Sequence, residues 1–386
     1  MRDTGRSPRI REPFVHIVKR GIPSKPLSIS VRVASFAVAI LICGIYILAV
    51  GKGEISVASA FRQMWEGTFG TPGNLRSIRI SVWDTAIYTT KLLCIAVALA
   101  PAFRMKFWNI GAEGQVIVGG LATAIIMHDF GNSLSKPVMI VLMIVVCILA
   151  GAIWGMIPAL FKANWGTNET LFTLMMNYVA MKIMDYFYNA WKGKMSALPN
   201  FPKNTWLPAL FDRSYGWNIV IFLLLAVLMY FYLKHTKQGY EISVVGDSVN
   251  TARYAGINVK KVIIRTMAIS GAICGLCGGL TVAGQNHAIA YSAEAVHTVT
   301  SGYGFTAIIV AWLANFNTLG MIAFSLLIRF LEKGTGQLGN SFPAFSVGSG
   351  NVLIGIVLFS IIGGAFFLRY KLVFRKRGKK EVSDRA

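Results

Sequence analysis

A stripe of polar side chains runs along a segment that is otherwise apolar. Residues 169–188 contain Glu169, Thr173 and Asn177 at intervals of four, which places the three side chains on one face of a helix. Lipid cannot satisfy a carboxylate, a hydroxyl or an amide, so the stripe should face a bundle interior or a water-filled path. Two interpretations are open at this point: hydrogen-bonded packing between helices, and the lining of a water-filled path.

A second polar group lies at the start of the apolar segment 107–127. Asn109, Glu113 and Gln115 stand there among glycines. Polar backbone at membrane depth is tolerated where it is buried in protein or lines a cavity, and a carboxylate there is a candidate functional residue. The alternative is that Glu113 bonds to backbone groups or to Arg104.

Several catalytic signatures are missing from the sequence. No phosphate-binding G-x-x-x-x-G-K-[ST] loop occurs, and the five histidines have no metal-ligand spacing. Cys274 and Cys277 form a C-x-x-C pair, but in a glycine-rich apolar segment this predicts small-residue packing rather than redox chemistry. We expect no enzyme activity, no metal site and no cofactor in this chain.

Ten apolar segments are expected to hold these residues in place as membrane-spanning helices. A bilayer core about 30 Å thick needs about 20 apolar residues per helix, and 55% of the 386 residues are apolar. We predict an all-α integral membrane protein of about ten transmembrane helices, some short or broken. The predicted spans are residues 33–50, 86–103, 107–127, 137–161, 169–188, 217–233, 262–283, 303–314, 319–331 and 352–368.

The net charge of +22 is concentrated in three segments. Residues 1–32 hold eight Lys and Arg, residues 234–265 hold six, and residues 369–386 hold eight. The positive-inside rule places all three in the cytoplasm, together with the N- and C-termini. We therefore expect a basic arm (1–32), a transmembrane domain (33–368) and a basic tail (369–386), with ends that contact anionic lipid rather than nucleic acid.

The cytoplasmic loop 234–261 contains a helix that is too short to span a membrane. Ser248 or Asp247 can cap its start, and Gly256 can end it in the left-handed conformation, which leaves residues 249–255. A helix of this length is marginal in water and needs a surface to pack against. We expect that surface to belong to another protein and the loop to transmit force into the membrane.

Two further segments have neighbours that the sequence leaves open. Gly271, Gly275 and Gly279 form a ridge of small residues that lets another helix approach closely, in this chain or a different one. The external loop 189–216 either receives a partner or covers the bundle as a lid.

Four stretches fall in order across the predicted membrane region: FWNIGAEGQ (107–115), GTNETLFTLMMNYVA (166–180), ARYAGINVKKV (252–262) and SGYGFTAIIVAWLANFNTLG (301–320). Together they resemble the permease subunits of ABC importers, in the family of branched-chain amino acid, ribose and nucleoside permeases. FWNIGAEGQ and the GYGF of the fourth stretch are most similar to the nucleoside branch, in particular that for purine nucleosides.

The resemblance implies the partners that this chain does not supply itself. A cytoplasmic ABC ATPase would bind ATP and magnesium, and a second permease, a related but different chain, would complete the path. A substrate-binding lipoprotein would deliver cargo from outside. The location implied is the bacterial cytoplasmic membrane, crossed many times. The cargo implied is a nucleoside or a related sugar.

The resemblance also assigns roles to residues. The short helix would be the coupling helix that seats in a groove of the ATPase. Ser248 stands where the family commonly has Asn, Thr251 where Ala is common, and Lys106 where Gly is frequent. The coupling residues would be Gly246, Asp247, Ser248, Asn250, Ala252, Arg253, Tyr254, Ala255 and Gly256.

A nucleoside path needs rings that stack on a base and polar groups that bond to a ribose. For the aromatic residues, anchoring at the lipid interface is the competing interpretation. The candidates for lining this path are Phe107, Trp108, Asn109, Glu113, Gln115, Glu169, Thr173, Asn177, Tyr303 and Phe305.

An alternative function is a secondary transporter or channel without an ATPase, in which Glu113, Glu169 and Asp185 relay protons.

Overall fold

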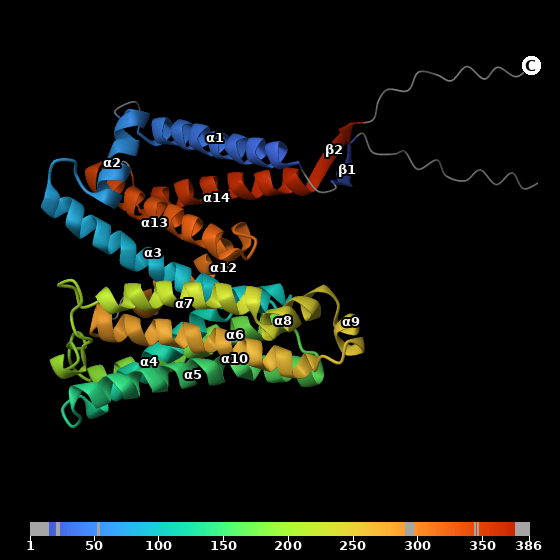
Figure 1. The fold of residues 1–386 in the computed structure, drawn as a ribbon. Coiled ribbons are helices and arrows are strands. Elements are labelled where there is room, and N and C mark those ends of the chain that lie inside the picture. Colours follow the sequence, from blue (N-terminus) through green and yellow to red (C-terminus); the bar gives the residue numbers. More distant parts are fainter. Residues whose placement is uncertain are drawn as a thin grey trace, which may run out of the picture. The chain divides into compact units, whose positions relative to one another are not determined.

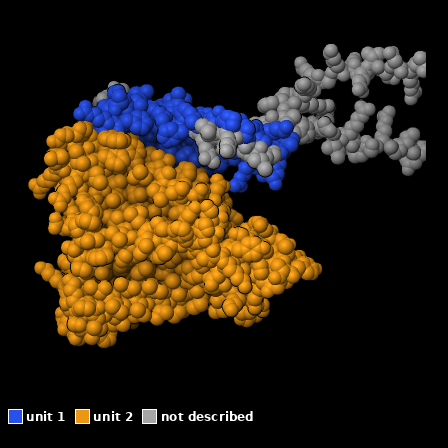
Figure 2. All heavy atoms as spheres, viewed as in Figure 1, with its two compact units in different colours: residues 1–63, 338–386 blue, residues 64–337 orange. Residues whose placement is uncertain are grey.

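The chain is almost entirely helical and divides into two compact units (Figures 1 and 2). A computed structural model describes residues 15–20, 24–51, 55–289, 297–342, 345 and 347–374. Unit 1 comprises residues 1–63 and 338–386, and unit 2 comprises residues 64–337.

Unit 1 contains a helix pair and a short β-ribbon. α1 (Lys25–Val50) packs beside α14 (Val347–Arg369), as Figure 1 shows. β1 (Val15–Lys19) pairs with β2 (Tyr370–Phe374) in antiparallel register. The described chain is otherwise mainly helical, which is consistent with the predicted all-α class. The sequence analysis did not predict the ribbon, although VHIVK and YKLVF are rich in the β-branched and aromatic residues that favour strands. Residues 1–14 and 375–386 of the predicted arm and tail lie outside the described residues.

Unit 2 is a helical bundle, and its boundary with unit 1 falls inside α2 and α13. Its elements are α2 (Val57–Phe69), α3 (Leu75–Arg104), α4 (Ala112–Phe130), α5 (Lys136–Trp165), α6 (Glu169–Lys192), the 3-10 turn η1 (Lys203–Thr205), α7 (Gly216–His235), α8 (Lys237–Asp247), α9 (Val249–Tyr254), α10 (Val259–Leu280), the π-helical turn η2 (Thr281–Asn286), α11 (His297–Thr300), α12 (Tyr303–Leu313) and α13 (Thr318–Ser341).

α3 is the central helix of this bundle, since every residue from Thr89 to Phe103 is buried. It begins at Leu75 rather than at residue 86, because the Asn74 side chain accepts a hydrogen bond from the Ser77 amide (3.1 Å) and caps it. Hydropathy predicted only the apolar part of α3, residues 86–103, and missed the more polar first turns.

Glycines allow α10 to lie directly against α5 and α4. A Cβ atom added at Gly271 would lie 2.2 Å from the Gly151 carbonyl oxygen, and one added at Gly275 would lie 2.3 Å from that of Cys147. A Cβ atom at Gly119 would in turn lie 2.2 Å from the Gly275 carbonyl oxygen. The neighbours of the glycine ridge therefore belong to this chain.

Six of the described helical segments are long and apolar enough to cross a membrane. They are Val33–Val50, Leu75–Arg104, Lys136–Trp165, Gly216–His235, Val259–Asn286 and Gly350–Arg369. Three more helices, α4, α6 and α13, have 19 to 24 residues but too many polar ones, and α12 is apolar but has 11 residues.

The polar interval between α7 and α10 contains two helices rather than the one predicted. α8 follows α7 almost without a break because the Thr236 hydroxyl caps it by accepting from the Gly239 amide (3.1 Å). α9 then ends at Tyr254, one residue earlier than predicted. Both helices lie at the end of unit 2 opposite to η1, and α9 projects beyond α7 and α10 (Figure 1).

Candidate functional site

α9 is a short, exposed helix with a defined stop signal at each end. The Ser248 hydroxyl accepts a hydrogen bond from the Thr251 amide (3.2 Å), which confirms the predicted cap at the start. Gly256 has the predicted left-handed conformation (φ +75°) just beyond the end of the helix at Tyr254. Ala252 is fully buried and anchors the helix, whereas Tyr254 is 92% exposed. A large aromatic side chain held out on a capped helix is suited to contact another protein.

α8 connects α9 to the ends of three long helices. A Cβ atom at Gly246 would lie 2.0 Å from the Arg104 carbonyl oxygen, so α8 lies directly against the end of α3. Arg104 donates a hydrogen bond to the Leu233 carbonyl at the end of α7 (3.3 Å). Glu241 pairs with Arg265 of α10 (3.0 Å). A displacement of α9 would therefore reach α3, α7 and α10.

The chain breaks between α3 and α4, directly beside this contact. Lys106 takes a left-handed conformation (φ +59°), which explains why glycine is suited to that position. Phe107 is 3% exposed, and its amide donates to the Ala102 carbonyl (2.9 Å). Asn109 accepts hydrogen bonds from the Gly111 amide (3.0 Å) and from the Gln115 side chain (3.3 Å), so Asn109 and Gln115 stabilise the break from within.

The polar stripe of α6 holds this break. The Thr173 hydroxyl accepts from the Ile110 amide (3.2 Å). The Asn177 amide accepts from the Gly114 amide (2.8 Å) and donates to the Ile110 carbonyl (2.9 Å). Both side chains are 1% exposed. These are the contacts expected of hydrogen-bonded helix packing, and a role in cargo binding stays a prediction.

Glu169 lies apart from the other two stripe residues, at the turn between α5 and α6. Its carboxylate pairs with Lys162 at 2.8 Å. Farther along α6, Lys182 and Asp185 form an i, i+3 ion pair at 3.3 Å.

Glu113 joins the start of α4 to the start of α12. Its carboxylate accepts hydrogen bonds from the Gly304 amide (2.7 Å) and from the Thr300 hydroxyl. A carboxylate at a helix N-terminus is favoured by the unpaired amides and by the helix dipole. Of the two interpretations, bonding to backbone groups is what the structure shows for this residue.

A cluster of charges between α3 and α13 was not predicted. Asp84 pairs with Arg329 (2.9 Å) and with Lys333 (2.7 Å), and Glu332 accepts a hydrogen bond from the Tyr303 hydroxyl (2.8 Å). The predicted spans 86–103 and 319–331 leave Asp84, Glu332 and Lys333 just outside the membrane, so hydropathy treated these three as loop residues. Arg329 lies inside a predicted span and was not singled out. The i, i+3 and i+4 spacing of the charges along residues 329–333 was the available signal.

Lys91 was also missed, although it lies within an apolar run. It is 1% exposed, and its ammonium group lies 3.5 Å from the Ser301 hydroxyl. An ionisable residue inside a membrane helix is a candidate functional residue in its own right.

The aromatic candidates are not brought together. Trp108 is 40% exposed and packs edge-on against Trp312, with ring centroids 5.0 Å apart. Tyr303 is 3% exposed and lies beside Tyr88, whereas Phe305 is 41% exposed. Within the described part of the chain, no three His, Cys, Asp or Glu side chains gather as a metal site.

Apolar spans packed around two broken helix starts, at α4 and α12, define a multi-pass transport permease of the cell membrane. Residues 81–362 match the family described as the permease component of the branched-chain amino acid transport system, and the chain belongs to this family. It is a permease subunit of an ABC importer, a transport subunit rather than an enzyme.

Relatives of known function are similar over most of the chain. The guanosine ABC transporter permease protein NupP of Bacillus subtilis is 31% identical over 289 residues, 72% of this chain and 78% of the relative. The nucleoside ABC transporter permease protein NupB of Lactococcus lactis is 26% identical over 67% of this chain and 73% of its own length. The glucose ABC transporter permease protein TsgB13 of Haloferax volcanii is 26% identical over 78% and 81%. No solved structure matches the chain significantly.

Proposed function

We propose that this chain forms the translocation path of an ATP-driven importer for nucleosides or related sugars. The observation that carries the cargo class is the 31% identity to a guanosine permease over 72% of the chain. A nucleoside permease and a glucose permease among the other relatives support the same range of cargo.

In the proposed architecture, the chain crosses the membrane ten times with both termini in the cytoplasm. The six long apolar segments are joined by α4, α6, α12 and α13. The β1–β2 ribbon supports a shared side for the two termini, because it pairs residues of the basic arm (1–32) with residues of the basic tail (369–386). Epitope tags at both ends should be accessible only after the inner face of the membrane is opened; an exposed tag on intact cells would contradict this orientation.

The proposed partners follow from the family. A cytoplasmic ABC ATPase binds ATP and magnesium, a second and related permease completes the path, and a lipoprotein delivers cargo from outside. Anionic lipid contacts the basic ends, and nucleic acid has no part. The ten path candidates named from the sequence line the path. They bind cargo weakly, because tight binding would slow its release.

Coupling to the ATPase is assigned to α9 and its flanks. The exposed Tyr254 and Arg253 would contact the ATPase, while Ser248, Gly256 and the buried Ala252 maintain the helix. The movement would pass through α8 at Gly246 to the α3–α4 break, which the α6 stripe holds. ATP binding would in this way alternate the path between outward and inward openings.

The test combines Arg253→Glu with Ala255→Pro in the assembled importer. The proline removes the hydrogen bond from the Ala255 amide to the Thr251 carbonyl (3.0 Å) and so unwinds the end of α9. We expect loss of guanosine uptake and of cargo-stimulated ATP hydrolysis. Lys203→Glu, an exposed charge reversal at the opposite end of unit 2, is the matched control. Normal uptake by a correctly inserted double variant would remove α9 from the mechanism.

A further inference from the structure

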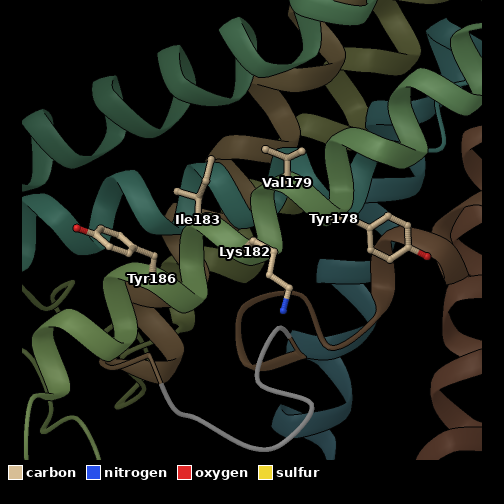
Figure 3. Close-up of a pocket in the computed structure, with 5 residues that line it drawn as sticks. All are labelled: Tyr178, Val179, Lys182, Ile183 and Tyr186. Atoms are coloured by element: carbon tan, nitrogen blue, oxygen red, sulfur yellow. The ribbon is translucent and has the colours of Figure 1, made fainter.

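α6 presents a second polar stripe, on its outer face. Tyr178, Lys182 and Tyr186 follow one another at intervals of four, so they share a helix face. Tyr178 and Tyr186 are 57% and 70% exposed, and the Lys182 side chain is 83% exposed. With Val179 and Ile183 they border an open hollow of about 460 Å³, in which the lysine lies between two tyrosine rings that point away from each other (Figure 3).

The depth of Lys182 makes lipid an unsuitable neighbour. α6 has 24 residues, and Lys182 lies about 15 Å from its end at Lys192, at a rise of 1.5 Å per residue. The ion pair with Asp185 is thus near the middle of the helix, where a charged side chain that faces hydrocarbon is costly. Such a pair is expected to face water or protein.

The neighbouring helices show what a lipid-facing surface looks like in this chain. In α5, every exposed side chain between residues 138 and 161 is apolar, and the same holds in α7 between residues 217 and 231. The structure describes all residues of both ranges. These include Val141, Val145, Leu149 and Ile153 on α5, and Leu223, Leu224, Val227, Leu228 and Phe231 on α7. The lysine and the tyrosines set the outer face of α6 apart from both.

We propose that this outer face of α6 is a wall of the water-filled translocation path and binds the cargo directly. A tyrosine ring stacks on a nucleobase, and the Lys182 ammonium donates hydrogen bonds to ribose or base oxygens. This inference rests on the proposed function and adds to it the residues that meet the cargo.

The two faces of α6 then have separate tasks. Thr173 and Asn177 attach the inner face to the α3–α4 break, which α8 contacts at Arg104. Tyr178 and Lys182 face the path. A movement that starts at α9 therefore reaches the cargo wall through a single rigid helix.

The first test measures whether water reaches this face. Val179→Cys and Ile183→Cys are introduced into the complete importer, and their reaction with a membrane-impermeant, positively charged methanethiosulfonate is timed. Val145→Cys on α5 and Leu224→Cys on α7 are the matched controls, and the unmodified chain, whose five cysteines are buried, gives the background. We expect the α6 variants to react at least about tenfold faster than the controls, and guanosine to slow that reaction.

Equal reaction rates on α5, α6 and α7 would overturn the water-filled path, and rates that neither guanosine nor glucose changes would overturn the cargo contact. Uptake by the unmodified importer in the same membranes tests the proposed function separately. If that importer takes up guanosine while the α6 cysteines stay unreactive, this inference alone fails; if it takes up neither compound, the proposed function fails.

The second test measures transport. Lys182→Met and Tyr178→Leu should each raise the KM for guanosine uptake at least about fivefold, and Lys182→Arg should restore most of the loss. Phe231→Leu, an exposed aromatic substitution on α7, should leave uptake unchanged. Unchanged kinetics in both α6 variants would overturn the assignment.

Discussion

Asn177 connects α6 to the broken start of α4 through both ends of its amide. Asn177→Leu leaves the Gly114 amide and the Ile110 carbonyl without these partners in a buried site. An unsatisfied buried group costs about 1–3 kcal/mol, so we expect a clear fall in melting temperature, measured by tryptophan fluorescence in detergent. Met175→Leu, on the exposed face of the same helix, should change it little.

The same variant separates the two interpretations of the stripe. A normal melting temperature together with slow uptake would contradict the structural role and place Asn177 among the cargo contacts. A loss of stability with normal transport in the surviving complexes would assign the stripe to packing.

His287 gives stability a dependence on pH. Its ring stacks on Trp206, with ring centroids 3.9 Å apart, and burial lowers the pKa of the imidazole below its ordinary value. The unfolded chain therefore binds a proton at a higher pH than the folded chain does. The contribution of the neutral His287 to the free energy of unfolding is therefore complete above the ordinary pKa of 6.5, and it should decrease as the pH falls below that value.

His287→Gln removes this titration. Between pH 7.5 and 5.5 the melting temperature of the variant should fall less than that of the unmodified chain. Parallel curves for the two proteins would contradict the burial of a neutral imidazole.

At the residue scale, the sequence located polar groups more reliably than it assigned their partners. Periodicity placed Thr173 and Asn177 on one face, and both do point inward. Their partners are backbone groups of residues 110 and 114, and such a contact depends on how the chain breaks after α3, which no local pattern encodes. The i, i+3 spacing of Lys182 and Asp185 is enough to predict their ion pair. That Lys182 lies on the exposed face of α6 depends on which face of the helix is buried, and the spacing does not encode this.

At the element scale, the glycine ridge determines how closely the helices of unit 2 approach. Gly271→Leu places a side chain against the backbone of α5, which cannot give way, so we expect a cost above about 3 kcal/mol and poor assembly. Gly355→Leu is the matched control, because nothing lies within 4 Å of a Cβ atom at Gly355. The measurement is monodispersity and melting temperature of the purified variants, and equal behaviour would contradict the close approach.

Hydropathy predicted which elements exist better than where they begin and end. α3 and α1 both start before their apolar parts, since a cap or a proline can begin a helix among polar residues. α8 was missed because the loop was interpreted from its polarity, although the caps of α9 were predicted correctly. The β1–β2 ribbon joins residues at opposite ends of the sequence, and such pairing is not a local property.

At the scale of the whole molecule, the composition and the missing phosphate loop indicate a transport chain driven either by an ion gradient or by an ATPase elsewhere, and the family resemblance favours the ATPase. Family membership supports that conclusion, and the contacts from α9 through α8 to the α3–α4 break give it a physical route. The claim that unifies these observations is that the chain moves cargo only when a separate ATPase acts on it.

Guanosine uptake into proteoliposomes tests that claim most directly. One preparation contains this chain with its ATPase and second permease, supplied with the binding protein and ATP, and another contains this chain alone with an imposed proton or sodium gradient. We predict uptake in the first that stops when ATP is replaced by a non-hydrolysable analogue, and none above background in the second. Full-rate uptake by the chain alone, with no nucleotide hydrolysed, would contradict the account.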